Sequence, residues 1–142
     1  MLRGEFADAG GSTPEELLSA YRRRLEEPID DGGVDAVARE SGVDRDLVAA
    51  LAGGNRPEVT LEQAAAILAT DGSLPDAETI AAEARDMLLM GMSTAVLDVE
   101  AIQSGIDAEM EAKEIQQKIE GRQAMTLAEY ARLHQFIESR KR

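Results

Sequence analysis

The sequence contains no cysteine and no tryptophan, and it has one histidine, His134. Without cysteine, disulfides, thiolate zinc sites and cysteine nucleophiles are excluded, and a single histidine cannot build a multi-histidine metal centre. Long apolar runs are also missing. No stretch approaches the roughly 18 residues of a membrane-spanning helix, and the first residues lack the apolar run of a signal peptide. We therefore expect a cytoplasmic protein with no membrane contact and no metal or other cofactor.

Aromatic residues are scarce, with two phenylalanines and two tyrosines in 142 residues. Since 44% of the residues are hydrophobic, the core must consist mainly of alanine, leucine, isoleucine, valine and methionine. Alanine is the best helix former and β-branched residues are a minority, so this composition favours helices over a β-sandwich. The length suits one domain, or two very small ones that share a core.

Basic residues are few compared with acidic ones. The chain has 28 acidic residues against 15 basic ones, and its net charge is −13. Acid-rich, lysine-poor usage with abundant alanine and glycine resembles that of proteins from salt-accumulating haloarchaea. The resemblance implies an acidic surface adapted to molar salt, where the screening length falls to about 3 Å. An acidic face shaped for a basic partner is the alternative.

Three capping boxes mark the starts of predicted helices. They begin at Thr13, Thr60 and Thr126, each followed three residues later by glutamate or glutamine, so that the two side chains cap the backbone reciprocally. Apolar periodicity predicts further helices over 34–41, 45–52 and 75–91. A connector rich in aspartate and glycine is expected over 28–33. The sequence thus predicts an all-α chain of seven to eight short helices.

Residues 33–69 have the pattern of a helix-turn-helix followed by a supporting helix. Gly42 can end the first helix in the left-handed conformation, Val43 would fill the angle between the helices, and Asp44 would cap the second. The stretch resembles the DNA-binding domain of the Cro/phage-repressor family. The matching residues are Ala38, Gly42, Val43, Val48 and Leu51. A sharp bend at Gly42 is therefore expected.

A second, weaker copy is predicted over 99–136. Ile115 and Ile119 repeat the spacing of Leu47 and Leu51, although the second turn is longer and has no clear glycine. We therefore expect two helix-turn-helix-like units packed around a central buried helix, with one compact domain as the alternative to separate parts. The expected parts are a leader (1–12), a first unit with its N-terminal helix (13–72), a central helix (73–93) and a degenerate second unit (94–142).

The whole pattern, with the sequence MTLAEYARL near its end, is similar to a haloarchaeal protein family of unknown function. This resemblance implies the fold and supplies no activity. Catalysis is not expected, because the glycines at 53–54 lack the lysine and the preceding strand of a phosphate-binding loop. In addition, no pair of carboxylates stands out as an acid and a base with separated pKa values.

The Cro-type resemblance implies that the start of the second helix enters the major groove of DNA. Arginine there pairs with guanine, and asparagine or glutamine with adenine. The expected DNA contacts are Arg45, Asn55, Arg56, Gln117, Lys118, Arg122 and Gln123. On this hypothesis the protein regulates transcription in a halophilic cytoplasm.

The other hypothesis is a protein-interaction or self-associating helical module that does not bind DNA. Phosphate contacts weaken steeply with salt, whereas apolar burial strengthens. A protein partner or a second copy would then contact the alanine-rich face at 49–52 or the methionine-rich helix at 75–91. The basic run at 22–24 is expected to be a solvated face balanced by glutamates, and a phosphate contact is its alternative.

Overall fold

The structure is a computed structural model that describes residues 5–6, 8–106 and 108–141. Within these residues the chain folds into eight α-helices and one short 3-10 helix, η1 (Ala9–Gly11), which confirms the all-α prediction. The α-helices are α1 (Pro14–Gly32), α2 (Val34–Ser41), α3 (Arg45–Ala52), α4 (Leu61–Leu68), α5 (Ala77–Ala95), α6 (Val99–Gly105), α7 (Ala112–Ile119) and α8 (Leu127–Arg140). No helix in this described part of the chain is both long enough and apolar enough to pass through a bilayer.

Side-chain caps explain where most helices begin. All three predicted capping boxes form, at Thr13, Thr60 and Thr126, with reciprocal hydrogen bonds to the residue three positions later. Asp76 and Asp98 cap α5 and α6 through a carboxylate oxygen that accepts from a backbone amide of the first turn. Each such cap stabilises its helix by about 1 kcal/mol.

The connector predicted over 28–33 is wrong, because α1 continues through Pro28 to Gly32. A proline inside a helix loses a backbone hydrogen bond and costs roughly 3 kcal/mol. Here Pro28 is buried and Ile29 is 1% exposed. Burial of an isoleucine side chain contributes about 1.5–3 kcal/mol, which offsets most of that cost. Packing against the rest of the fold therefore extends the helix past its local stop signal.

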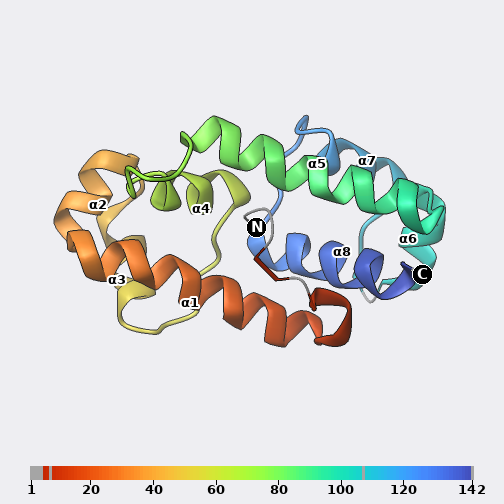
Figure 1. Cartoon of the computed structure of the whole chain (residues 1–142), viewed down its shortest axis with the longest axis horizontal. Helices are drawn as coiled ribbons and strands as arrows, with labels where there is room; N and C mark the ends of the chain where they lie inside the picture. Colours follow the sequence, from red (N-terminus) through yellow and green to blue (C-terminus); the bar gives the residue numbers. More distant parts are fainter. Residues whose placement is uncertain (1–4, 7, 107, 142) are drawn as a thin grey trace.

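The chain forms two halves with the same order of elements. A 19-residue helix, α1 or α5, is followed in each half by three shorter helices. In Figure 1, α1 runs from right to left along the lower edge, and α5 runs from left to right along the upper edge. The last helix of each half packs against the long helix of the other half: α4 packs against α5, and α8 packs against α1. The two halves are thus related by an approximate half-turn.

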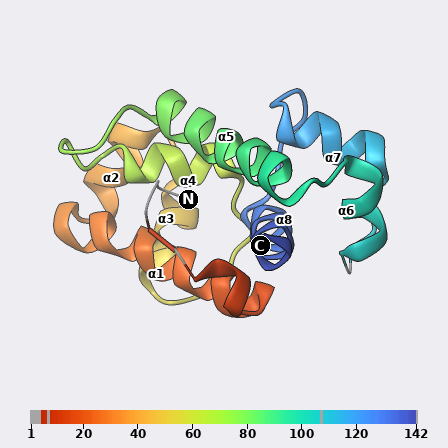
Figure 2. The ribbon, with the colours of Figure 1, turned by 45° about the vertical axis from the view of Figure 1, so that its right-hand side comes forward.

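An antiparallel bridge joins the two halves at Thr60 and Thr126. The amide of Leu61 donates to the carbonyl of Met125 at 2.8 Å, and the amide of Leu127 donates to the carbonyl of Val59 at 2.7 Å. The bridge places the starts of α4 and α8 side by side. Figures 1 and 2 show the consequence: α2 and α3 lie at one end of the molecule, and α6 and α7 at the other.

The halves share one core. Tyr21 of α1 and Tyr130 of α8 are fully buried beside each other, and the hydroxyl of Tyr130 donates to the carbonyl of Ala84 in α5 at 3.0 Å. Helix α5 joins the two halves as the first helix of the second half, whereas the sequence predicted a central buried helix between two units. It is buried on one side only, because Leu89 and Met90 on its outer side are 44% and 55% exposed.

The described part of the expected leader packs onto this core. The rings of Phe6 and Tyr21 meet in a T-shaped arrangement with 4.8 Å between their centroids, and Ala9 is 1% exposed. Gly10 lies so close to α8 that an added Cβ would come within 2.8 Å of the backbone of Glu138. Residues 8–12 therefore form a fixed contact with the last helix.

Candidate nucleic-acid interface

The bend between α2 and α3 has the predicted geometry. Gly42 has φ 74° and ψ 5°, and its N–H donates to the carbonyl of Ala38 at 3.0 Å. Val43 is buried beneath the corner, and the carboxylate of Asp44 accepts from the amide of Asp46 at 2.8 Å. Residues 42–44 thus turn the chain sharply, and α2 and α3 cross as two separate helices.

Arg45 lies at the exposed start of α3, where acidic side chains surround it. Its guanidinium hydrogen-bonds to the carboxylate of Asp35 in α2, which raises the pKa of Arg45. Asp44 and Asp46 flank it on both sides in the sequence. Asp35 competes with a base or phosphate for Arg45, although an exposed ion pair of this kind is weak.

The loop that follows α3 is fixed by its own backbone. Gly54 has φ 76°, and the amide of Asn55 donates back to the carbonyl of Ala50 at 3.0 Å. The side chains of Asn55 and Arg56 are exposed. Among the described residues, neither side chain has a hydrogen bond or an ion pair. Two of the predicted contact residues are therefore presented to solvent on a defined loop, directly after α3.

Arg22 of α1 is a further basic residue, and it was outside the predicted contact set. It is half-buried, and its Nε is buried without a hydrogen-bond partner among the described residues. Burial lowers the pKa of Arg22, and the nearby positive charge of Arg56 lowers it further. Arg24, two residues on, instead pairs with Glu5 at 3.0 Å and Glu27 at 2.7 Å. The basic run at 22–24 was the sequence signal for this cluster.

The loop after α7 has the same backbone as the loop after α3. Gly121 has φ 81°, and the amide of Arg122 donates to the carbonyl of Gln117 at 2.9 Å, as Asn55 does to Ala50. This match aligns Asn55 with Arg122 and so fixes which residues of the two halves correspond. Ile115 corresponds to Val48, and Lys118 corresponds to Leu51. The predicted match of Ile115 and Ile119 with Leu47 and Leu51 is therefore wrong by one residue.

Lys118 occupies a core position and is 7% exposed. Its Nζ lies 2.8 Å from a carboxylate oxygen of Glu114 and 2.5 Å from one of Glu129. Burial lowers the pKa of Lys118, but the hydrogen bonds to the two carboxylates outweigh burial and raise it. This ammonium group is held inside the protein and is not placed to reach a phosphate.

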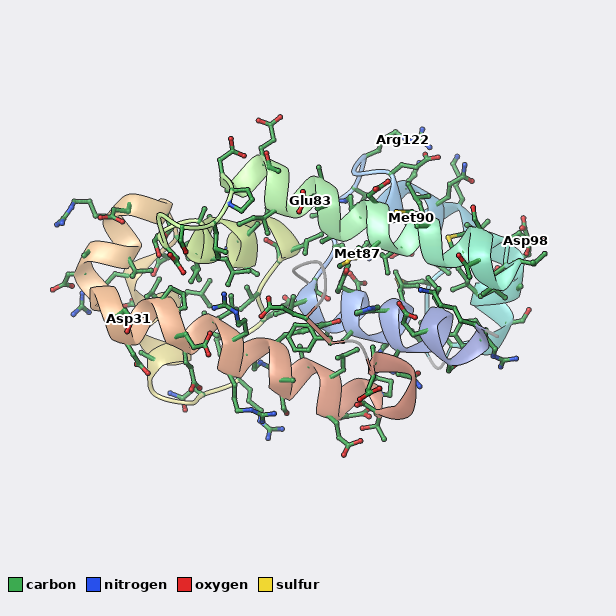
Figure 3. All side chains as sticks on the ribbon, viewed as in Figure 1. Asp31, Glu83, Met87, Met90, Asp98 and Arg122 are labelled. Carbon is green, nitrogen blue, oxygen red and sulfur yellow. The ribbon has the colours of Figure 1, made fainter. Side chains whose placement is uncertain are left out.

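The other predicted residues of the second unit lie nearer the surface. Gln117 is half-buried, whereas Gln123 and Arg122 are exposed. Arg122 projects at the outer edge of the molecule in Figure 3, and its guanidinium hydrogen-bonds to the carboxylate of Glu120. The structure therefore places the first and second predicted clusters at opposite ends of the fold, and it leaves fewer free cations in the second.

An apolar surface runs along α5 beside α6 and α7. Leu89 lines a hollow of about 290 Å³ together with Met92, Val99 and Ile119. Val96, just after α5, is 89% exposed and has a left-handed backbone with φ 55°. Met87, by contrast, lies on the side of α5 that faces α8 (Figure 3). In the described part of the chain, no three histidine, cysteine, aspartate or glutamate side chains are grouped to hold a metal ion.

These features define an all-α protein made of two similar four-helix halves. The chain belongs to a family of unknown function, DUF5791, which matches residues 17–140 and so confirms the expected membership of such a family. No curated protein and no solved structure matches the chain.

Proposed function

We propose that this protein is a non-enzymatic, DNA-associated regulator that contacts the duplex through its first helix-turn-helix unit. The observation that carries the proposal is the loop directly after α3, which exposes Asn55 and Arg56 on a fixed backbone, with no side-chain partner among the residues that the structure describes. In proteins of the Cro type the corresponding helix lies in the major groove. Arginine and asparagine are the side chains that read guanine and adenine there.

The second unit contributes less to this proposed interface. Lys118 is buried between Glu114 and Glu129, so we do not propose it as a DNA contact. Arg122 faces Glu120. Gln117 and Gln123 remain as secondary candidates. We propose that the second unit mainly supports the fold and that α3, with Arg45 and the loop after it, forms the contact.

A net charge of −13 opposes an approach to DNA in dilute salt. Molar salt screens this repulsion beyond about 3 Å, although it also weakens phosphate contacts. We therefore propose a salt-rich cytoplasm as the setting, in line with the acid-rich and lysine-poor composition. Base contacts and shape then supply most of the affinity.

Fluorescence anisotropy with a labelled mixed-sequence duplex tests the proposal, in tenth-molar and in molar KCl. The wild type is expected to bind, and the double variant Asn55→Ala, Arg56→Ala is expected to bind about tenfold or more weakly. Lys113→Ala is the matched control, since Lys113 lies on α7, outside the proposed interface. If the wild type binds in neither salt, the proposal is wrong.

The apolar surface along α5 favours a second candidate function, self-association. Leu89, Met90 and Val96 are the large apolar side chains that are most exposed among the described residues. Salt strengthens apolar burial, so a dimer through this surface would persist in brine. Sedimentation velocity in molar KCl tests it. A dimer that Leu89→Ser and Val96→Ser together dissociate, while Ala82→Ser does not, supports this candidate; a wild-type monomer at all concentrations excludes it.

A further inference from the structure

We propose that the apolar surface along α5 binds an amphipathic helix of another protein, one with an apolar face and basic flanks. The floor of this surface, its length and its acidic rim together define that partner. The inference goes beyond both functions proposed above, because neither DNA contact nor self-association requires a helical partner of opposite charge. A second copy of the chain is the competing occupant, and the experiment below separates the two.

The floor of the surface is an apolar groove that follows α5 where it contacts α7. A hollow of about 540 Å³ begins at Ala77 and Ala81 and reaches Leu89 and Ile119. The hollow of about 290 Å³ beside α6 shares the last two residues with it, and a third hollow shares Leu89 and extends to Val96. Helix α5 rises about 28 Å over its 19 residues. A docked helix of about five turns has the same length.

Large apolar side chains lie in solvent along this groove at a cost to stability. Leu89, Met90 and Val96 are the exposed large apolar residues in the part of the chain that the structure describes. Val96 is in addition a β-branched residue with a left-handed backbone, which is a strained combination. Strain of this kind concentrates at functional sites. Grooves that bind an amphipathic helix bury such side chains against the apolar face of the partner, and methionine adapts to its shape.

The rim of the groove is acidic. Among the described residues, five carboxylate side chains and one arginine line the first two hollows, whereas the whole chain has 28 acidic and 15 basic residues. The five are all exposed: Glu62, Glu78, Asp86, Asp98 and Glu120. The arginine, Arg85, is half-buried, and a carboxylate oxygen of Glu62 lies 2.6 Å from its guanidinium. Since Glu78 belongs to α5 and Glu120 directly follows α7, negative charge lies on both sides of the floor.

The acidic rim decides between the occupants. Two copies that pair through this surface about a two-fold axis bring their own carboxylates together, and like charges in contact oppose association. A helix with lysine or arginine on both sides of an apolar face pairs with these carboxylates while it covers Leu89 and Val96. In molar salt, apolar burial is strengthened and supplies most of the affinity, and the charged pairs act only at contact distance.

Peptide binding tests the proposal. The probe is a fluorescein-labelled helical peptide of about 18 residues, with leucine on one face and lysine on both flanks, and a matched peptide carries glutamate in place of lysine. Anisotropy is measured in molar KCl and in the lowest KCl concentration at which circular dichroism shows a folded protein. The lysine peptide is expected to bind in both, more tightly in the lower salt. The glutamate peptide is expected to bind about tenfold or more weakly in the lower salt.

Two apolar variants locate the binding on α5. Leu89→Ser should weaken binding of the lysine peptide about tenfold in both salts, because an anchor at the centre of the groove is lost. Val96→Gly should also weaken binding, although it is expected to raise the thermal midpoint. Its loss of affinity is therefore separate from any loss of folding.

A pair of charge variants tests the rim. Glu78→Gln combined with Glu120→Gln should weaken binding of the lysine peptide about threefold in the lower salt and less in molar KCl. Asp30→Asn combined with Glu40→Gln removes the same charge from α1 and α2 and should leave binding unchanged.

Equal binding of the two peptides in the lower salt, unchanged binding in Leu89→Ser, or equal weakening by both charge variants would each overturn the proposal. A wild type that binds neither peptide overturns it too, and a dimer in sedimentation velocity then assigns the surface to a second copy. All of these results leave the DNA proposal standing, because the first helix-turn-helix unit takes no part in them.

Discussion

His134 is held neutral inside the folded protein, and its replacement by glutamine is expected to make stability less sensitive to pH. The imidazole is 6% exposed and packs beside the rings of Tyr21 and Tyr130. The hydroxyl of Tyr21 and Nδ1 of His134 share a hydrogen bond, and Nε2 lies 3.7 Å from a carboxylate oxygen of Glu138. Burial, helped by the positive Lys141, lowers the pKa of His134 to about 3.

The magnitude follows from proton linkage. An unfolded histidine has a pKa of about 6.5, so between that value and about 3 the unfolded chain binds one proton more than the folded chain. Stability contributed by His134 is therefore present at pH 7 and is lost as the pH falls below 6.5. With these two pKa values, the loss between pH 7 and pH 5 is about 2 kcal/mol.

Urea unfolding at pH 7 and pH 5, in the same molar KCl, measures this loss. Because His134 is the only histidine, the difference between wild type and His134→Gln cancels the carboxylates that titrate in both proteins. The free energy of unfolding of the wild type should fall by about 2 kcal/mol more than that of the variant. Parallel curves, or an imidazole resonance that titrates near pH 6.5 in the folded wild type, would rule out a buried neutral imidazole.

Two backbone predictions concern left-handed residues. Gly42→Ala should lower the free energy of unfolding by about 1–2 kcal/mol, because φ is 74° although no atom within 4 Å obstructs a Cβ; an unchanged urea midpoint would contradict this. Val96→Gly should instead raise the thermal midpoint and the free energy of unfolding, the latter by up to about 1 kcal/mol. The reason is that Val96 is a β-branched residue at φ 55° whose side chain is 89% exposed. A lower midpoint would show that Val96 makes a stabilising contact.

The parts of the fold that were predictable from sequence are encoded locally. A capping box needs two residues three positions apart, so the starts of α1, α4 and α8 follow from Thr13, Thr60 and Thr126 alone. The bend at Gly42 is also local. Pro28 shows the limit of local prediction, because α1 continues past this local stop signal and buries Pro28 and Ile29.

The candidate site depended more on distant pairs and was predicted less well. Lys118 resembles a surface lysine in its own helix, and Glu129, which helps to hold it inside, comes from α8. The exposed loop residue Asn55 was predictable, because a glycine turn between two short helices is itself a local feature.

Amide chemical shifts map DNA contact onto the chain and so test the proposed interface most directly. A nitrogen-15-labelled protein is titrated with a short duplex in the lowest KCl concentration at which the protein stays folded. We expect the shifted amides to concentrate in residues 44–56, with α5 and α7 little changed. Shifts concentrated in α7 and the loop after it, or an unchanged spectrum at saturating duplex, would contradict binding through the first helix-turn-helix unit.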